Sequence, residues 1–273
     1  MRFDLSDTLR LPFESAECVV HIAGEKRDTS KMWAVNVDGT DRMLAWSRDH
    51  SVKRFVLLSS VGVYGAKRNA GVVTETTPHN PRNVYEQTKD TAERRALQFC
   101  HDHDIECVVL QPSNVIGAHN PTVMPLVGFI RAIARGMLVQ FGSDAWTNYV
   151  CVEDVAHALV VACTDPNCTG TYILNQDIPL VEVVQTVASG LGVPVPRYRL
   201  PRAAGVLLGE VGHLLERVSG RSLPMNRERV RDLSNSTRYD GARFVAATRF
   251  RYTVGVHSTL VALAERYVAA GIL

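Results

Sequence analysis

Tyr85 and Lys89 are four residues apart in the segment Tyr85-Glu-Gln-Thr-Lys89. Within a helix this spacing places both side chains on one face, one turn apart. A lysine ammonium next to a phenol favours the tyrosinate and can lower the phenol pKa from about 10 towards neutrality. The tyrosine can then act as an acid or a base on a substrate hydroxyl or carbonyl. Many surface helices contain this spacing by chance, so the pair needs support from other residues.

A hydroxyl-rich turn upstream of the pair supplies this support. The apolar run at 54–58 predicts a buried strand, and Ser59 and Ser60 follow it directly. In open α/β sheets, ligands bind at the carboxyl ends of the strands. A serine there can donate a hydrogen bond to the substrate oxygen on which the tyrosine acts. Ser60, Tyr85 and Lys89 are therefore the candidate catalytic residues.

The elements that must position these residues alternate along the first half of the chain. Continuous apolar runs at 19–23, 54–60 and 107–110 predict strands, and apolar residues at helical spacing predict helices at 33–49 and 82–103. Strands that are apolar throughout and alternate with helices are typical of a parallel sheet covered on both faces. The predicted fold class is therefore α/β.

The second half of the chain has a looser pattern, because prolines interrupt shorter helices and strands beyond about residue 118. This pattern predicts a small substrate-binding cap at the carboxyl end of the sheet. We expect residues 1–117 and parts of 145–178 to form the core with the catalytic residues. Residues 118–144 and 179–273 would mainly form the cap and the C-terminal helices.

The composition excludes several classes of protein. The chain has 273 residues, 46% hydrophobic and 21% charged, as in an ordinary soluble globular protein. A formal net charge of +2 gives no support to nucleic-acid binding. No apolar stretch approaches the roughly 20 residues that span a bilayer, and the first residues do not resemble a signal peptide. We expect a cytoplasmic protein that binds neither nucleic acid nor membrane.

The cysteines and histidines do not form a metal-binding pattern. The six cysteines include no C-x-x-C pair, and none of the nine histidines has a zinc-ligand spacing. Several cysteines lie within apolar runs, which is typical of buried thiols in a reducing compartment. We predict reduced cysteines and no metal site.

Further segments complete a pattern that resembles the extended short-chain dehydrogenases/reductases, in the NAD-dependent epimerase/dehydratase group. These segments are His21-Ile-Ala-Gly-Glu-Lys26, Asn36-Val-Asp-Gly-Thr40, Gln111-Pro-Ser-Asn-Val-Ile-Gly117 and Tyr149-Val-Cys-Val-Glu-Asp-Val155. The residues of the first segment most resemble those of UDP-galactose 4-epimerases. The resemblance to the family covers nearly the whole chain. It implies a Rossmann-type core that binds NAD or NADP, a nucleotide-sugar substrate, and a homodimer formed through the helices that carry Asn36 and Tyr85.

The resemblance also implies roles for individual residues. Tyr85 would be the general acid or base, Lys89 would activate it and contact the cofactor ribose, and Ser60 would orient the substrate. The cofactor would further contact the residues at matching positions, which are Asp4, Leu5, Ala23, Gly24, Lys26, Asn36, Ser59 and Pro112. Asn36 would also help to hold the active-site helix. Lys26 could instead be a solvated lysine, and Asn36 a helix cap.

Substrate contacts are implied for Asn114 and for the arginine-rich stretch that includes Arg227. A guanidinium group matches the geometry of a diphosphate, although a solvated helical face is the commoner meaning of such a stretch. Thr147 and Asn148 stand where sugar-nucleotide enzymes of the family usually have Arg-Asp, and Gln111 replaces another family arginine. Val61 and Gly62 follow Ser60 in place of Asp-Glu, which argues against a 4,6-dehydratase.

The largest departure from the family is at the start of the chain. The family begins with a strand and G-x-x-G-x-x-G, whose amides bind the cofactor pyrophosphate, and this sequence contains no such loop. Met1 falls inside what would be the third strand. We therefore expect an N-terminally truncated sheet that binds a dinucleotide poorly, and we favour a misassigned start or a remnant over a new role.

Three functions are consistent with these residues. The first is an NAD(P)-dependent nucleotide-sugar epimerase. The second is a reductase or dehydrogenase of the same group that acts on a steroid-like or flavonol-like alcohol or ketone. The third is a truncated, catalytically weak or silent family member. The joint presence of Ser60, Tyr85 and Lys89 argues against the third.

Overall fold

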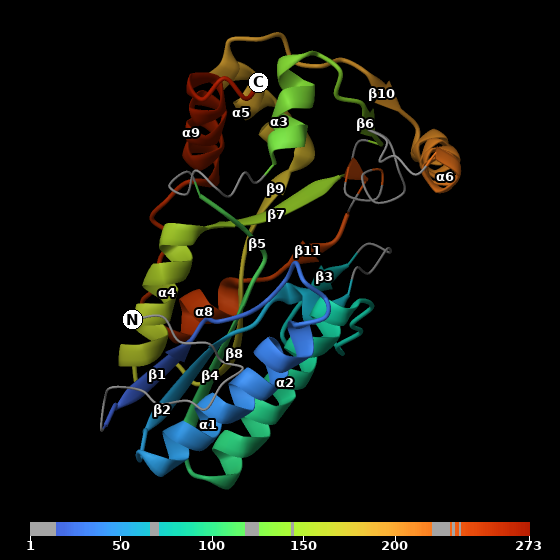
Figure 1. Cartoon of the computed structure of the whole chain (residues 1–273). Coiled ribbons are helices and arrows are strands. Elements are labelled where there is room, and N and C mark those ends of the chain that lie inside the picture. The colour runs from blue at the N-terminus through green and yellow to red at the C-terminus, as the bar shows by residue number, and fades with distance from the viewer. Residues whose placement is uncertain are drawn as a thin grey trace.

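A parallel sheet of four strands lies at the centre of the lower layer of the molecule (Figure 1). In the order in which they pair, its strands are β1 (Cys18–His21), β2 (Arg54–Leu58), β4 (Glu106–Pro112) and β8 (Gly170–Leu174). Our computed structural model describes residues 15–65, 71–117, 126–142, 145–219, 230, 233–234 and 236–273. Asp4, Leu5 and Arg227, for which contacts were predicted, lie outside these residues.

Helices cover both faces of this sheet (Figure 1). They are α1 (Gly39–Asp49) and α2 (Val84–Asp102) on one face, and α4 (Val152–Thr164) and α8 (Ala242–Ala247) on the other. Successive residues of β2 point to opposite faces, so Phe55 and Leu57 pack with Ala96 of α2, whereas Val56 packs with Ala158 of α4. Burial on both faces explains why the strand is apolar throughout.

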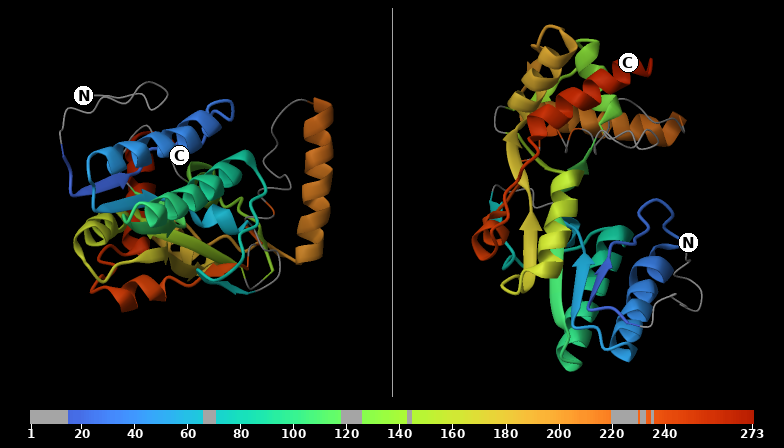
Figure 2. Two further views of the ribbon diagram at one scale, coloured as in Figure 1. Left: turned by 90° about the horizontal axis from the view of Figure 1, so that it is seen from below. Right: turned by 90° about the vertical axis from the view of Figure 1, so that its left-hand side faces the viewer.

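The upper layer is built on a second sheet, which continues from the first. Its strands are β5 (Asn114–Ile116), β7 (Trp146–Cys151) and β9 (Gln176–Pro179). The helices of this layer are α3 (Val127–Ala134), α5 (Leu180–Leu191), α6 (Arg202–Ser219) and α9 (Val256–Ala269). Helices α3, α5 and α9 share an apolar core with the sheet, whereas α6 stands at one side of the molecule (Figure 2). None of the described helices is long and apolar enough to cross a membrane.

Two strands pass from the lower sheet into the upper sheet through a single residue each. Ser113 joins β4 to β5, and Asn175 joins β8 to β9. The two joins are adjacent, because the Ser113 backbone N–H donates a 3.0 Å hydrogen bond to the carbonyl oxygen of Leu174. The carboxyl ends of the lower strands therefore face the upper layer directly.

Short elements complete the structure. They are a π-helical segment (Trp33–Asp38), a 3-10 helix (Val61–Tyr64), and the strand pairs β3 (Val72–Val73) with β11 (Arg238–Tyr239) and β6 (Gln140–Phe141) with β10 (Arg199–Leu200). The structure confirms the α/β class, the parallel sheet covered on both faces, and each strand and helix predicted in the first half of the chain. The main difference is at 33–38, where the predicted helix begins with π-helical rather than α-helical turns.

The prediction that all cysteines are reduced is wrong for one pair. Cys18 of β1 and Cys163 of α4 form a disulfide, with their Cα atoms 6.2 Å apart. The helix packs across the edge strand of the sheet, and the separation of 145 positions between the two cysteines conceals this proximity in the sequence. Cys100, Cys107 and Cys151 are free thiols, as is Cys168.

Gly65 closes the turn that follows Ser60, and we expect its replacement by alanine to destabilise the protein. Its φ of +65° is a conformation that favours glycine, and an added Cβ would overlap with the backbone oxygen of Asn80. Strain of this kind costs about 1–3 kcal/mol, and the overlap adds to it. Urea unfolding of the Gly65→Ala variant measures the loss.

Gly136 provides the matched control for this prediction. Its φ is +64°, but an added Cβ would lie in open space. Gly136→Ala should therefore cost about 1 kcal/mol from backbone strain alone. Equal losses in the two variants would show that the contact with Asn80 has no energetic effect.

Candidate active site

A cleft of about 1100 Å³ lies between the carboxyl ends of the lower strands and the upper sheet. Its floor includes Ile22, Leu58 and Pro112, which come at or just after the ends of β1, β2 and β4. Helix α2 contributes Tyr85 and Lys89 to one wall. The structure thus brings together, in a single cleft, Ser59, Ser60, Gly24, Lys26, Tyr85, Lys89, Pro112 and Asn114 from the predicted set.

Two local caps fix the relative positions of Ser60 and Tyr85. The Ser60 hydroxyl accepts a hydrogen bond from the Gly62 N–H at 3.1 Å and thereby starts the 3-10 helix. The Asn83 side chain accepts one from the Glu86 N–H at 2.9 Å and starts α2, so that Tyr85 lies in the first turn. The side chains of Tyr85 and Ser60 line the same cleft, and the Ser60 hydroxyl favours the ionised form of the Tyr85 phenol. The two hydroxyls, which the sequence predicts to act on one substrate oxygen, therefore lie in one cleft.

The expectation that Lys89 lowers the pKa of Tyr85 is wrong for this arrangement. Burial raises the pKa of the Tyr85 phenol, and the Ser60 hydroxyl opposes this rise only in part. The Lys89 ammonium instead donates a 2.6 Å hydrogen bond to the backbone oxygen of Leu58, at the end of β2. The spacing in the sequence correctly predicts that Tyr85 and Lys89 share one face of the helix. It does not predict that the Lys89 ammonium points to the Leu58 oxygen.

Lys89 is itself strongly affected by its surroundings. Its side chain is only 7% exposed, and burial lowers its pKa to about 8, against the opposing charge of Glu93. A lysine with this pKa loses its proton under mildly alkaline conditions. Any step that needs its positive charge should therefore weaken above about pH 8.

Asn36 fastens the loop after β1 to the helix that carries Tyr85. Its side-chain amide donates hydrogen bonds to Thr88 Oγ1 at 3.0 Å and to the Glu25 backbone oxygen at 2.9 Å. Its side-chain oxygen accepts the Glu25 N–H at 2.6 Å. Asn36 lies within a helix and so does not cap one. It holds the active-site helix, as the sequence suggested, while Lys26 nearby is exposed at the rim of the cleft.

His21 lies behind this loop, and we expect it to make the fold sensitive to acid. Burial, followed by the positive charge of Lys89, lowers its pKa to about 4 from 6.5. Below about pH 6.5 His21 is protonated in the unfolded chain but stays neutral in the folded chain. The free energy of unfolding therefore falls as the pH drops from 6.5 to 4. The loss is about 3 kcal/mol.

Replacing His21 with glutamine should remove this loss, because glutamine does not titrate. The check is urea unfolding of both proteins near neutral pH and near the folded pKa of about 4. His101→Gln, at an exposed position in the last turn of α2, is the control and should keep the acid sensitivity. An unchanged acid loss in His21→Gln would contradict the assignment.

The upper wall of the cleft consists of uncharged side chains among the described residues. Thr147 and Asn148 line it, but the Thr147 hydroxyl donates to the Ile178 backbone oxygen and the Asn148 amide to that of Thr237, both at 2.9 Å. Asn114 donates a 3.1 Å hydrogen bond to the backbone oxygen of Asn148. Lys26 and Lys89 are the charged side chains in the described lining.

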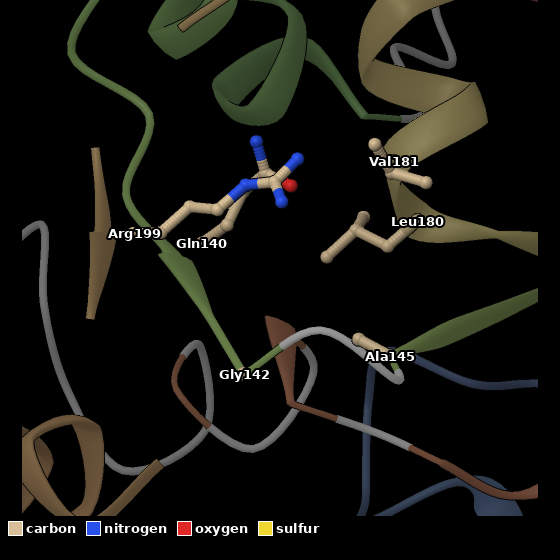
Figure 3. Close-up of a pocket in the computed structure, with 6 residues that line it drawn as sticks. All are labelled: Gln140, Gly142, Ala145, Leu180, Val181 and Arg199. Atoms are coloured by element: carbon tan, nitrogen blue, oxygen red, sulfur yellow. The ribbon is translucent and has the colours of Figure 1, made fainter. Parts of the chain in front are cut away.

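A second pocket, of about 50 Å³, lies within the upper layer (Figure 3). Gln140 and Arg199 enter it from the paired strands β6 and β10, opposite Leu180 and Val181 of α5. It is far smaller than the cleft and lacks the predicted catalytic residues. The cleft with Ser60, Tyr85 and Lys89 is therefore the candidate active site.

Two features of this site were not predicted from the sequence. The first is Trp146, which lines the upper wall and has the Arg238 guanidinium over its ring, 4.2 Å from the ring centre. The second is the buried carboxylate of Glu93. A signal for Glu93 was present, because it lies four residues beyond Lys89 on the same face of the helix.

Comparisons with known proteins agree with this geometry. A family model described as the NAD dependent epimerase/dehydratase family matches residues 4–174. The chain is 26% identical over 239 residues to N-acetyl-alpha-D-glucosaminyl-diphospho-ditrans,octacis-undecaprenol 4-epimerase of Escherichia coli O157:H7, covering 83% of this chain and 70% of that protein. It is 25% identical over 234 residues to a UDP-glucose 4-epimerase of Vibrio cholerae, covering 79% of this chain and 70% of that protein.

A solved structure shows the same fold. The UDP-glucuronic acid 4-epimerase from Bacillus cereus, in complex with NAD, superposes with a TM-score of 0.69 at 18% sequence identity. The match covers 98% of this chain and 78% of the other. The Rossmann-like arrangement predicted from the sequence is thereby confirmed.

Proposed function

The chain belongs to the NAD-dependent epimerase/dehydratase family, and from this premise we propose that it is a nucleotide-sugar epimerase that uses NAD or NADP. The observation that carries the proposal is the convergence of Ser60, Tyr85 and Lys89 in one cleft of about 1100 Å³. The similarity to 4-epimerases supports the class of reaction.

The residues of the cleft fit the nicotinamide ring and the adjoining ribose of the cofactor at the edge of the sheet. Ile22, Leu58 and Pro112 offer an apolar floor for a flat ring. Lys89 uses one N–H for the Leu58 oxygen, and an ammonium has two more to offer to ribose hydroxyls. When bound, the cofactor supplies the acceptor and donor of hydride.

The side chains then handle the proton. Ser60 holds the reacting hydroxyl by a hydrogen bond, and Tyr85 removes its proton when the alcohol is oxidised and returns one when the ketone is reduced. The raised pKa of Tyr85 favours the protonated phenol, which is the form that returns a proton to the ketone, whereas removal of the proton from the alcohol requires the ionised form.

The test is incubation of the purified chain with UDP-glucose and NAD, with the sugar products separated by chromatography. We expect a C4 epimer to form without accumulation of reduced cofactor, because each hydride removed is returned. Titration with NAD and NADP under the same conditions measures cofactor binding. Absence of an epimer although NAD binds would overturn the proposal for this substrate class.

A second candidate function is a reductase or dehydrogenase that acts on an uncharged alcohol or ketone. The observation that favours it is the uncharged upper wall of the described cleft, where Thr147 and Asn148 already use their side-chain donors on the backbone. Such an enzyme would convert the cofactor stoichiometrically with its substrate. Accumulation of reduced cofactor with a hydroxysteroid would therefore support this function over the first.

A further inference from the structure

Glu93 extends the catalytic face of α2 by one turn, beneath the cleft. Tyr85, Lys89 and Glu93 follow one another at intervals of four residues and so lie on one side of the helix. The Glu93 side chain is 2% exposed and does not line the cleft. A carboxylate is rarely buried to this extent without partners, because its desolvation is costly.

The partners of Glu93 come from two neighbouring strands. The Ser59 hydroxyl donates to Glu93 Oε2 at 2.7 Å. The Gln111 amide donates to both carboxylate oxygens, at 2.9 and 3.1 Å, while its own oxygen accepts the Tyr64 hydroxyl at 2.6 Å. One carboxylate thus joins the end of β2, the end of β4 and helix α2.

Each of these partners precedes a residue of the cleft. Ser59 comes directly before Ser60, and Gln111 directly before Pro112. Residues that hold reacting groups must be fixed to within about 0.5 Å for efficient catalysis. Fixing Ser59 and Gln111 to the helix that carries Tyr85 therefore sets the distance between the two reacting hydroxyls.

The negative charge of Glu93 also stabilises the Lys89 ammonium. The direct partner of Lys89 is the neutral oxygen of Leu58, and His21 on β1 interacts with it electrostatically. The charge of Glu93 favours the protonated form of Lys89 against burial. Without this carboxylate, the ammonium would lose its proton at a lower pH.

The surroundings of Glu93 contain other charged groups. His79 Nε2 is 3.9 Å from Glu93 Oε1, and the other ring nitrogen of His79 lies 2.7 Å from Asp90. Asp90 is paired with Arg94 at 2.7 Å. Burial raises the pKa of Glu93, whereas the hydrogen bonds from Ser59 and Gln111 favour its ionised form.

We propose that Glu93 is a positioning residue of the active site, which ties the strand ends that carry Ser60 and Pro112 to α2 and places a carboxylate one helical turn from the buried Lys89 ammonium. Glu93 touches neither substrate nor cofactor in this arrangement and acts through Ser59, Gln111 and Lys89. The catalytic part of the proposal rests on the proposed function, whereas the effect on Lys89 does not.

The Glu93→Gln variant tests the charge, because glutamine keeps the shape and part of the hydrogen bonding. Lys89 protonation is measured by amine labelling across pH, with the labelled lysine identified by mass spectrometry. We expect the labelling midpoint of Lys89 to fall by about one pH unit, equivalent to a tenfold change in its proton affinity. A midpoint that does not move in a folded variant would overturn the proposal, whatever the enzyme does.

Activity provides the second measurement. In Glu93→Gln the fall in kcat on the alkaline side should begin about one pH unit lower than in the wild type. Glu93→Asp keeps the charge and should restore the Lys89 midpoint, and it also serves as the folded variant if glutamine is not tolerated. Asp90→Asn is the control, because Asp90 is buried on the same helix but does not bond Ser59 or Gln111.

These outcomes separate the two levels of the proposal. Loss of stability in Asp90→Asn and Glu93→Gln alike, with the same Lys89 midpoint in both, would mean that Glu93 is only structural. A shifted midpoint in a protein without epimerase activity would refute the proposed function and leave the link from Glu93 to Lys89 intact.

Discussion

Replacement of Tyr85 by phenylalanine is expected to reduce epimerisation by about 10³-fold. The phenol lines the cleft together with Ser60, where it can exchange a proton with the substrate, and general acid–base catalysis contributes about 10²–10⁴-fold. Phenylalanine keeps the ring and its packing, so the fold and cofactor affinity should change little. Steady-state rates and a cofactor titration on the same preparation measure the two effects separately.

Tyr198→Phe is the matched control for this variant. Tyr198 is 66% exposed in the upper layer and does not line the cleft, so the loss of its hydroxyl should leave the rate unchanged. A Tyr85→Phe enzyme that retained more than about a tenth of the wild-type rate would show that another group transfers the proton.

Replacement of Lys89 by methionine should lower the activity. It should also remove the rise in the free energy of unfolding with pH that the buried lysine causes. The rate should fall by about 10²-fold, because the ammonium that would hold the cofactor ribose in place is lost. Cofactor affinity should fall with it, unlike in Tyr85→Phe. Titration with NAD therefore distinguishes the two variants.

The stability effect follows from the low pKa of Lys89. In the folded chain this pKa is about 8, against 10.5 when the lysine is solvated. Between these values the unfolded chain binds more protons, so the free energy of unfolding of the wild type rises with pH. We expect the wild type to gain about 3 kcal/mol relative to the methionine variant over this interval.

Urea unfolding at both ends of the interval measures this difference. Comparison with the variant cancels the contribution of other groups that titrate there. Lys53→Met, at an exposed position before β2, should retain the pH dependence of the wild type. Parallel curves for the wild type and Lys89→Met would contradict the buried environment assigned to this lysine.

Much of the fold could be predicted from the sequence because its signals are local. The run that forms β2 is apolar throughout, since Phe55 and Val56 are buried against helices on opposite faces of the sheet. The grouping of Ser60 with Tyr85 and Lys89 was also predictable. A strand end followed by a helix on the next crossover brings these positions to the same edge of a parallel sheet.

The features that the sequence did not reveal depend on contacts between distant segments. The Cys18–Cys163 disulfide joins residues separated by 145 positions. The pKa of Tyr85 depends on how deeply the assembled cleft buries the phenol. The spacing to Lys89 predicted a lowered pKa, whereas burial raises it. Glu93 could be placed on the catalytic face of α2, but its bonds to Ser59 and Gln111 require the paired strands β2 and β4.

The one-residue joins at Ser113 and Asn175 have a consequence for engineering the protein. Each strand that crosses from the lower to the upper sheet leaves no linker at which the chain could be cut, and the upper layer draws on segments from across the sequence. Neither layer of the described structure is formed by one contiguous segment, so the two should melt in a single cooperative transition. A chimera that borrows the substrate wall of a relative would need crossovers at both positions and at the boundary between β7 and α4, in the register that places Ser113 against Leu174.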